Sequence, residues 1–211
     1  MIAVNLEREE TIITHLEDIW RTTFVPQFVP NSCVLASRVA NEVFDYFGIP
    51  NEVIPVSAIA MNEKMDNYWK QSVPMEQWED DAYSVGVMPD IRITPNGIDR
   101  RDGMGFEGHL IVTTPSYLLD LSALQFHRPK YNIVTNGPLI VSRQAVTTAI
   151  VGGTRTFSKI ILEQGMILYE PLKNYTFLKS QDWKKGYREP SSFIIRAIKP
   201  ILTKLKETSN G

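Results

Sequence analysis

The amino-acid sequence predicts an α+β fold in a single domain, residues 1–211, with a helical N-terminal part and an antiparallel sheet. Two segments near the N-terminus carry apolar residues at helical spacing. Short apolar runs bounded by turn residues follow them and indicate strands. With 211 residues, 43% of them hydrophobic, the chain can bury one sizeable core.

Two helices are expected in the N-terminal part. The first spans about residues 7–22 and has one apolar face, made of Ile12, Ile13, Leu16, Ile19 and Trp20. The second has clearer ends, because Asn31 and Ser32 are N-cap residues and Gly48 followed by Pro50 is typical of a helix end. Its apolar stripe begins in the first turn, at Cys33, Ala36, Ala40, Val43, Phe44 and Phe47.

Strands are expected after the second helix. One strand spans residues 51–60, and two short strands at 109–114 and 117–122 flank Pro115-Ser116. A hairpin at 159–172 turns at Gln164-Gly165. The last element is a helix at about 191–206, which Pro200 is expected to interrupt.

Residues 61–107 lack a regular pattern, apart from a short helix expected near 62–71. Irregular segments of this length inside a compact domain are often lids or binding walls. We therefore expect this segment to form one wall of a substrate cleft. Its apolar surface would come from Trp69, Trp78, Met104 or Phe106.

Composition argues against several classes of function. The net charge is -2 without a basic patch, which argues against nucleic-acid binding. No apolar run approaches the roughly 20 residues of a membrane span, and charged residues at 7–10 argue against a signal peptide, so a cytoplasmic protein is expected. The single cysteine forms no internal disulfide, and the 3 histidines are far apart, so neither a metal site nor a cofactor is expected.

Cys33 is the first candidate for chemistry. A thiolate at a helix N-terminus is stabilised by the positive end of the helix dipole and by free backbone N–H groups. The alternative is that Cys33 is a small buried apolar residue, which is the commoner role of a lone cysteine.

His109 and Asp120 are the second and third candidates. If the two strands close over Pro115-Ser116, Ile111 faces Asp120, and His109 lies diagonal to Asp120 on the same face of the sheet. Asp120 also stands among leucines, where an unpaired carboxylate would be costly. The alternatives are a structural histidine and a solvent-facing strand-end aspartate.

Two sequence segments carry a family resemblance over about residues 27–127: NSCVLASRVANEVFDYFGIPNEVIPV around Cys33, and GHLIVTTPSYLLDLS around His109 and Asp120. They resemble the core of the papain-like and transglutaminase-like cysteine peptidase superfamily, in which a nucleophile helix packs on an antiparallel sheet. The resemblance implies a Cys-His-Asp triad, and an oxyanion role for Gln27, six residues before Cys33. The Cys-Gly-x-Cys-Trp signature of papains is absent.

The expected function is that of a cysteine-dependent hydrolase, a peptidase or amidase. Cys33 would form an acyl-thioester, His109 would act as base and acid, and Asp120 would orient His109. The substrate would be a peptide or small amide that contacts Trp69, Phe106 and Gly108. An acyltransferase of the same fold and a non-catalytic binding module remain as alternatives.

Overall fold

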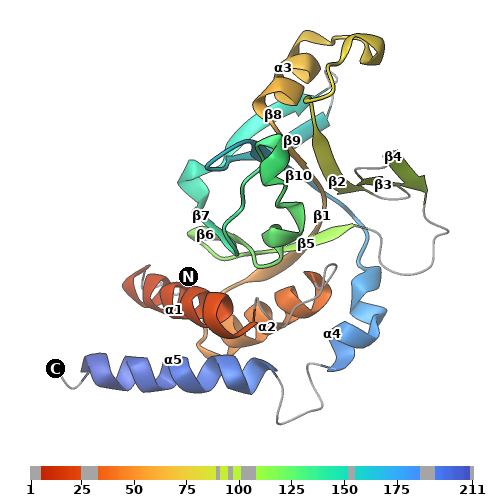
Figure 1. Ribbon diagram of the computed structural model, residues 1–211. Helices are drawn as coiled ribbons and strands as arrows, with labels where there is room; N and C mark the ends of the chain where they lie inside the picture. The colour runs from red at the N-terminus through yellow and green to blue at the C-terminus, as the bar shows by residue number, and fades with distance from the viewer. Residues whose placement is uncertain are drawn as a thin grey trace.

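The computed structural model describes residues 6–24, 33–88, 91–94, 97–100, 108–151, 155–185 and 193–209. Its helices and its antiparallel sheet confirm the α+β class. Helices α1 (Leu6–Ile19), α2 (Cys33–Tyr46) and α5 (Phe193–Ser209) lie together beside one end of a curled sheet, as Figure 1 shows. The short helix α3 (Glu63–Gln71) lies at the opposite end of the molecule.

The helical layer follows the apolar stripes of the sequence. The first predicted helix is present as α1, which continues into a π-helical turn at Trp20–Phe24. Helix α2 ends before Gly48, whose φ of 68° lies in the left-handed region that glycine adopts without strain. The helices share one buried cluster with the sheet, which includes Ile12, Leu16, Ala36, Ala40, Val43, Phe44, Ala197 and Ile201.

Helix α5 contradicts the expected interruption at Pro200, because the helix continues through that residue. Proline removes one backbone N–H and crowds the preceding turn, which disfavours a helix interior. The apolar face of α5 offsets this cost: Ala197 and Ile201, on either side of Pro200, are fully buried against the other helices. Tertiary packing therefore overrides local propensity here.

Strand β1 (Glu52–Met61) is the centre of the sheet, because it pairs with three antiparallel neighbours. One edge pairs with β10 (Met166–Pro171). The first half of the other edge pairs with β5 (His109–Thr113), and the second half pairs with β2 (Ser84–Met88). The sheet therefore divides along one edge of β1 into two branches, which begin with β5 and β2.

Both branches, and the strands on the opposite edge of β1, continue in antiparallel order. On one side β5 leads to β6 (Tyr117–Asp120) and β7 (Leu139–Ser142), and β2 leads to β3 (Ile91–Thr94) and β4 (Gly97–Arg100). On the other side β10 leads to β9 (Arg155–Ile161) and β8 (Thr147–Val151). The predicted 159–172 hairpin is confirmed, with Ile161 opposite Met166 and Gly165 at a φ of 80°.

The described residues between 61 and 100 are more regular than the sequence indicated. Helix α3 is confirmed, but strands β2, β3 and β4 were not expected. Gly86 in β2 explains part of this difference, since a Cβ there would lie 2.6 Å from the Ala58 carbonyl oxygen. The glycine that suggests an irregular segment in the sequence is the residue that lets β2 approach β1 closely.

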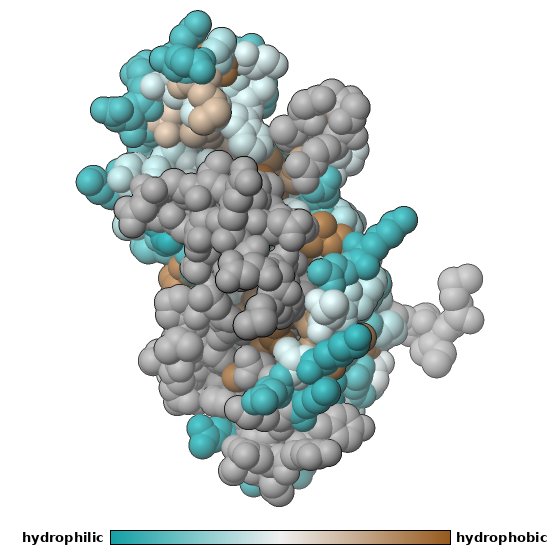
Figure 2. All heavy atoms as spheres, turned by 90° about the vertical axis from the view of Figure 1, so that its right-hand side faces the viewer, coloured by the Kyte–Doolittle hydropathy of each residue, from teal (hydrophilic) through white to brown (hydrophobic). Residues whose placement is uncertain are grey.

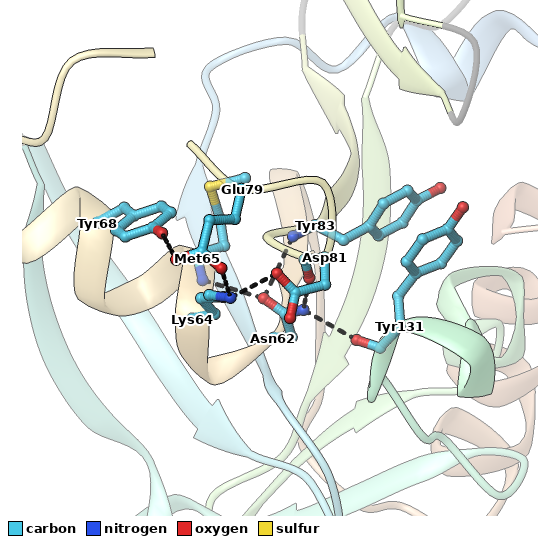
Figure 3. A network of polar contacts seen from close by, with 8 residues as sticks. All are labelled: Asn62, Lys64, Met65, Tyr68, Glu79, Asp81, Tyr83 and Tyr131. Carbon is cyan, nitrogen blue, oxygen red and sulfur yellow. Dashed lines mark hydrogen bonds and ion pairs between the residues drawn. The ribbon is translucent and has the colours of Figure 1, made fainter. Parts of the chain in front are cut away.

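A polar network fastens α3 to its surroundings (Figure 3). The Asn62 side-chain oxygen accepts from the Met65 N–H at 3.0 Å and the Tyr83 N–H at 3.2 Å, so Asn62 caps the helix. Its amide nitrogen donates to the Tyr131 carbonyl at 3.1 Å. Lys64 bridges the carboxylates of Glu79 and Asp81, both at 2.6 Å. These contacts hold residues 62–83 against the end of the sheet that carries α3.

The two faces of β5 and β6 belong to different cores. Val112 and Leu119 face the helical layer. Ile111 and Leu118 face a second cluster inside the curl of the sheet, which also contains Val56, Phe126 and Tyr169. Side chains alternate along a strand, so His109 and Asp120 belong to the second face.

Glu9 links the helical layer to the turn between β5 and β6. Its side chain is fully buried, although it stands in the first turn of α1. The carboxylate accepts from the Ser116 N–H at 3.1 Å and the Ser116 hydroxyl at 3.0 Å, and also from the Thr114 hydroxyl. A buried carboxylate with three donors holds this turn in place.

We expect Glu9→Gln to lower the free energy of unfolding by about 1–3 kcal/mol, because an amide cannot accept all three hydrogen bonds. Urea denaturation measures the change, and Glu10→Gln is the matched control, since Glu10 is exposed on the same turn. Equal stability of the two variants would show that the Glu9 contacts contribute little.

The surface in Figure 2 is mostly hydrophilic where residues are described, and hydrophobic residues show only as small patches. Among the described residues, none of the helices combines the length and the apolar character that a membrane crossing requires.

Candidate active site

The hairpin register places His109 and Asp120 on one face, as the sequence indicated. Val112 lies opposite Leu119 and Thr113 opposite Leu118, and the Thr114 N–H donates to the Tyr117 carbonyl at 2.9 Å. This is the register of a hairpin that closes over Pro115-Ser116. His109 is the first residue of β5 and Asp120 the last of β6.

His109 and Asp120 form a hydrogen bond of 2.8 Å between the ring Nε2 and the carboxylate Oδ2. Both residues are completely buried. Asp120 accepts further bonds from the Tyr169 hydroxyl at 2.6 Å, the Ser122 N–H at 3.0 Å and the Ser122 hydroxyl at 3.2 Å. Four donors therefore satisfy a carboxylate that would be costly to bury alone.

Cys33 is the first residue of α2, at the positive end of the helix dipole. It is 7% exposed and packs with Leu110 and Phe177, beside the partly buried Trp183. One turn later, the Ser37 hydroxyl lies 3.4 Å from the Leu110 carbonyl oxygen, which ties the start of α2 to the start of β5. The contact between the thiol and the imidazole is a hydrogen bond between the Cys33 and His109 side chains, which is among the causes that raise the pKa of His109.

The charge on His109 depends on both neighbours. Burial lowers the pKa of His109. The charge of Asp120 and the hydrogen bond to its carboxylate act in the opposite direction, and so do a hydrogen bond to Cys33 and the charge of Cys33. Together they raise the pKa of His109 to about 10. The carboxylate and the thiol thus both favour the imidazolium. Burial and the Asp120 carboxylate raise the pKa of Tyr169, so its hydroxyl stays protonated and donates to Asp120.

The other predicted site residues are placed differently. Trp69 and Trp78 pack against a cluster of Ile59, Met61, Met65, Phe157, Met166 and Leu168, separate from the cluster that contains Cys33. The structure therefore does not bring Trp69 to the Cys33 cluster, and these tryptophans do not form the expected wall. Gly108 is buried beside His109 with a φ of 136°, a conformation that favours glycine. Gln27, Met104 and Phe106 lie outside the described residues.

Sequence reasoning missed three polar neighbours of the pair: Tyr169, Ser122 and Gln125. Ser122 had a local signal, because a residue two positions after an aspartate often donates to its carboxylate. Tyr169 lies 49 residues from Asp120 and reaches it only through the pairing of β1 with β10. The Gln125 amide nitrogen lies 2.8 Å from Nδ1 of His109.

No family model matches this chain, and no curated protein or solved structure matches it either.

Proposed function

We propose that this protein is a cysteine-dependent hydrolase, a peptidase or amidase, with Cys33 as nucleophile, His109 as base and acid, and Asp120 as the group that orients His109. The observation that carries the proposal is the contiguous arrangement of thiol, imidazole and carboxylate at the start of α2 and the ends of β5 and β6. The same layout is the reason to propose a papain-like or transglutaminase-like core.

Each group supplies what the reaction requires. Asp120 occupies Nε2 of His109, so the ring is oriented and Nδ1 is the nitrogen that exchanges protons with the thiol. The helix N-terminus and the imidazolium both stabilise a thiolate at Cys33. Burial of the pair strengthens these electrostatic interactions, because little water screens them.

The proposed reaction has two halves. First, the proton of Cys33 passes to Nδ1 of His109, and the resulting thiolate sulfur attacks the amide carbonyl carbon. His109 then donates that proton to the amine nitrogen as the carbon–nitrogen bond breaks, which leaves an acyl-thioester and a free amine. In the second half, His109 takes a proton from water, the resulting hydroxide attacks the thioester, and the carboxylic acid leaves as the thiol recovers its proton.

An activated ester tests this proposal directly. After incubation with p-nitrophenyl acetate, we expect an acetyl group on Cys33 by intact-mass spectrometry and tryptic mapping, and continued release of nitrophenolate beyond one equivalent. His109→Ala should remove the continued release, and Cys33→Ala should remove the adduct as well. Release by wild type no faster than by Cys33→Ala would overturn the proposal.

The same acyl-enzyme separates the hydrolase from the acyltransferase. If water is the natural acceptor, added amines should leave the rate of nitrophenolate release nearly unchanged. A large, saturable acceleration by one class of amine would instead assign the protein to the acyltransferases. A binding module without catalysis would show at most a single equivalent of release.

A further inference from the structure

Both ring nitrogens of His109 are engaged by side chains other than Cys33. Nε2 lies 2.8 Å from Asp120, and Nδ1 lies 2.8 Å from the side-chain nitrogen of Gln125. The proposed reaction needs Nδ1, because it is the nitrogen that Asp120 leaves available. Gln125 therefore lies at the atom where Cys33 would deliver its proton.

The chemistry of this contact sets its effect. An amide nitrogen donates hydrogen bonds and does not accept them. When the ring is neutral, Gln125 donates to an unprotonated Nδ1, while the Nε2–H donates to Asp120. Gln125 thus favours the neutral ring, whereas Asp120 and Cys33 favour the imidazolium. Gln125 and the thiol compete for one nitrogen.

The backbone around Gln125 is fixed, but its side chain has room to move. Gln125 lies in a 3-10 turn (Ala123–Phe126), where its N–H donates to the Ser122 carbonyl at 3.1 Å. Its own carbonyl accepts from Arg128 Nη1 at 3.0 Å. Phe126 is buried and anchors the turn. Its ring and the His109 ring pack in a T-shaped arrangement, with the two ring centroids 5.3 Å apart. Gln125 itself is partly exposed, so rotation about its side-chain bonds could expose Nδ1 without disturbing this backbone.

We propose that Gln125 is a positioning residue that covers Nδ1 of His109 in the free protein and withdraws when a substrate occupies the site. This inference rests on the proposed function. It assigns the free protein a restrained state, in which the thiol shares Nδ1 with an amide. Withdrawal of the amide gives Nδ1 to Cys33, and the proton passes from sulfur to nitrogen.

Alkylation of Cys33 by iodoacetamide at about pH 6 tests the proposal, because an unassisted thiol is mostly protonated there. Gln125→Met keeps the side-chain length and removes the amide, and Gln125→Ala is the second variant if the first packs poorly. We expect labelling about tenfold faster than wild type, the effect of losing one hydrogen bond on an equilibrium. Leu124→Ala is the matched control, since Leu124 is 40% exposed on the same turn.

Nitrogen-15 NMR of the imidazoles supplies a second measurement, which would not change if Gln125 only supported the fold. The chain has 3 histidines, so His109→Ala identifies the His109 signals. We expect Nδ1 of His109 to be unprotonated in a larger fraction of wild type than of Gln125→Met at the same pH.

The outcomes separate this inference from the proposed function. If His109→Ala slows labelling but Gln125→Met labels at the wild-type rate or more slowly, the proposed function stands and the inference is overturned, because Gln125 then supports the imidazolium or only the fold. If wild type labels like free cysteine and His109→Ala changes nothing, the proposed function fails, and the inference falls with it.

Discussion

Iodoacetamide should alkylate Cys33 at about pH 6 on the order of 100-fold faster than it alkylates free cysteine. A free thiol has a pKa of about 8.5 and is almost entirely protonated at that pH. We expect faster labelling because Cys33 is the first residue of α2 and lies beside His109, whose imidazolium would attract a negatively charged sulfur. Low exposure of Cys33, at 7%, works in the opposite direction by limiting access of the reagent.

A pH–rate profile of alkylation separates these effects. Access changes the rate by a similar factor at every pH, whereas thiolate stabilisation moves the midpoint of the profile to lower pH. His109→Ala should slow labelling at about pH 6 and move the midpoint upward, because the cation that stabilises the thiolate is lost.

His15→Ala is the control for this measurement, since His15 lies on α1 away from the Cys33 cluster. An ordinary thiol profile for wild type, unchanged by His109→Ala, would falsify the catalytic interpretation. Cys33 would then be a small buried apolar residue.

Local patterns predicted the elements that carry the proposed triad. The apolar stripe and the Gly48 end signal predicted α2, and the Pro115-Ser116 turn set the register that places His109 diagonal to Asp120. Both signals are local, because helix periodicity and a two-residue turn depend only on neighbouring residues. The position of Cys33 at the first turn of its helix follows from the same pattern.

The structural features that the sequence did not predict depend on contacts between residues that are distant in the sequence. Strand β2 exists because Gly86 lets it approach β1, and α5 passes Pro200 because Ala197 and Ile201 are buried against other helices. The burial of Glu9 depends on donors more than 100 residues away, at a separation of 107 for Ser116. No local pattern indicates such pairings, so the surroundings of His109 and Asp120 were less predictable than the register that places these two residues on one face.

Asp120→Asn should reduce turnover of the activated ester on the order of 10⁴-fold while leaving the fold intact. The Ser122 N–H and hydroxyl both donate to Oδ1 of Asp120, so the asparagine oxygen would face them. Its amide nitrogen would then face Nε2 of His109, where it donates rather than accepts. The ring would then carry its proton on Nδ1, which cannot accept the proton of Cys33. Tyr169→Phe is the graded control, because it removes one of the donors to Asp120 and keeps the carboxylate.

The folded protein should be less stable at high pH than at low pH, and Asp120→Asn should remove this pH dependence. The measurement shows whether the carboxylate acts through the charge of His109. The pKa of His109 is raised from 6.5 to about 10 in the folded protein, so its protonation stabilises the fold fully below pH 6.5, and this contribution is lost as the pH rises through 10. We therefore expect the free energy of unfolding to fall between those two pH values. The measurement is urea denaturation in a Cys33→Ala background, which removes the titration of the thiol from the same range. This background also lowers the upper end of the window, because Cys33 contributes to the raised pKa of His109.

In that background, Asp120→Asn should flatten the curve above pH 6.5, because the imidazolium has lost its main stabilising charge. If turnover falls but the pH dependence of stability persists, Asp120 orients the ring without controlling its charge. Should neither change, the hydrogen bond between Asp120 and His109 would be structural, and the carboxylate would have no part in the proposed reaction.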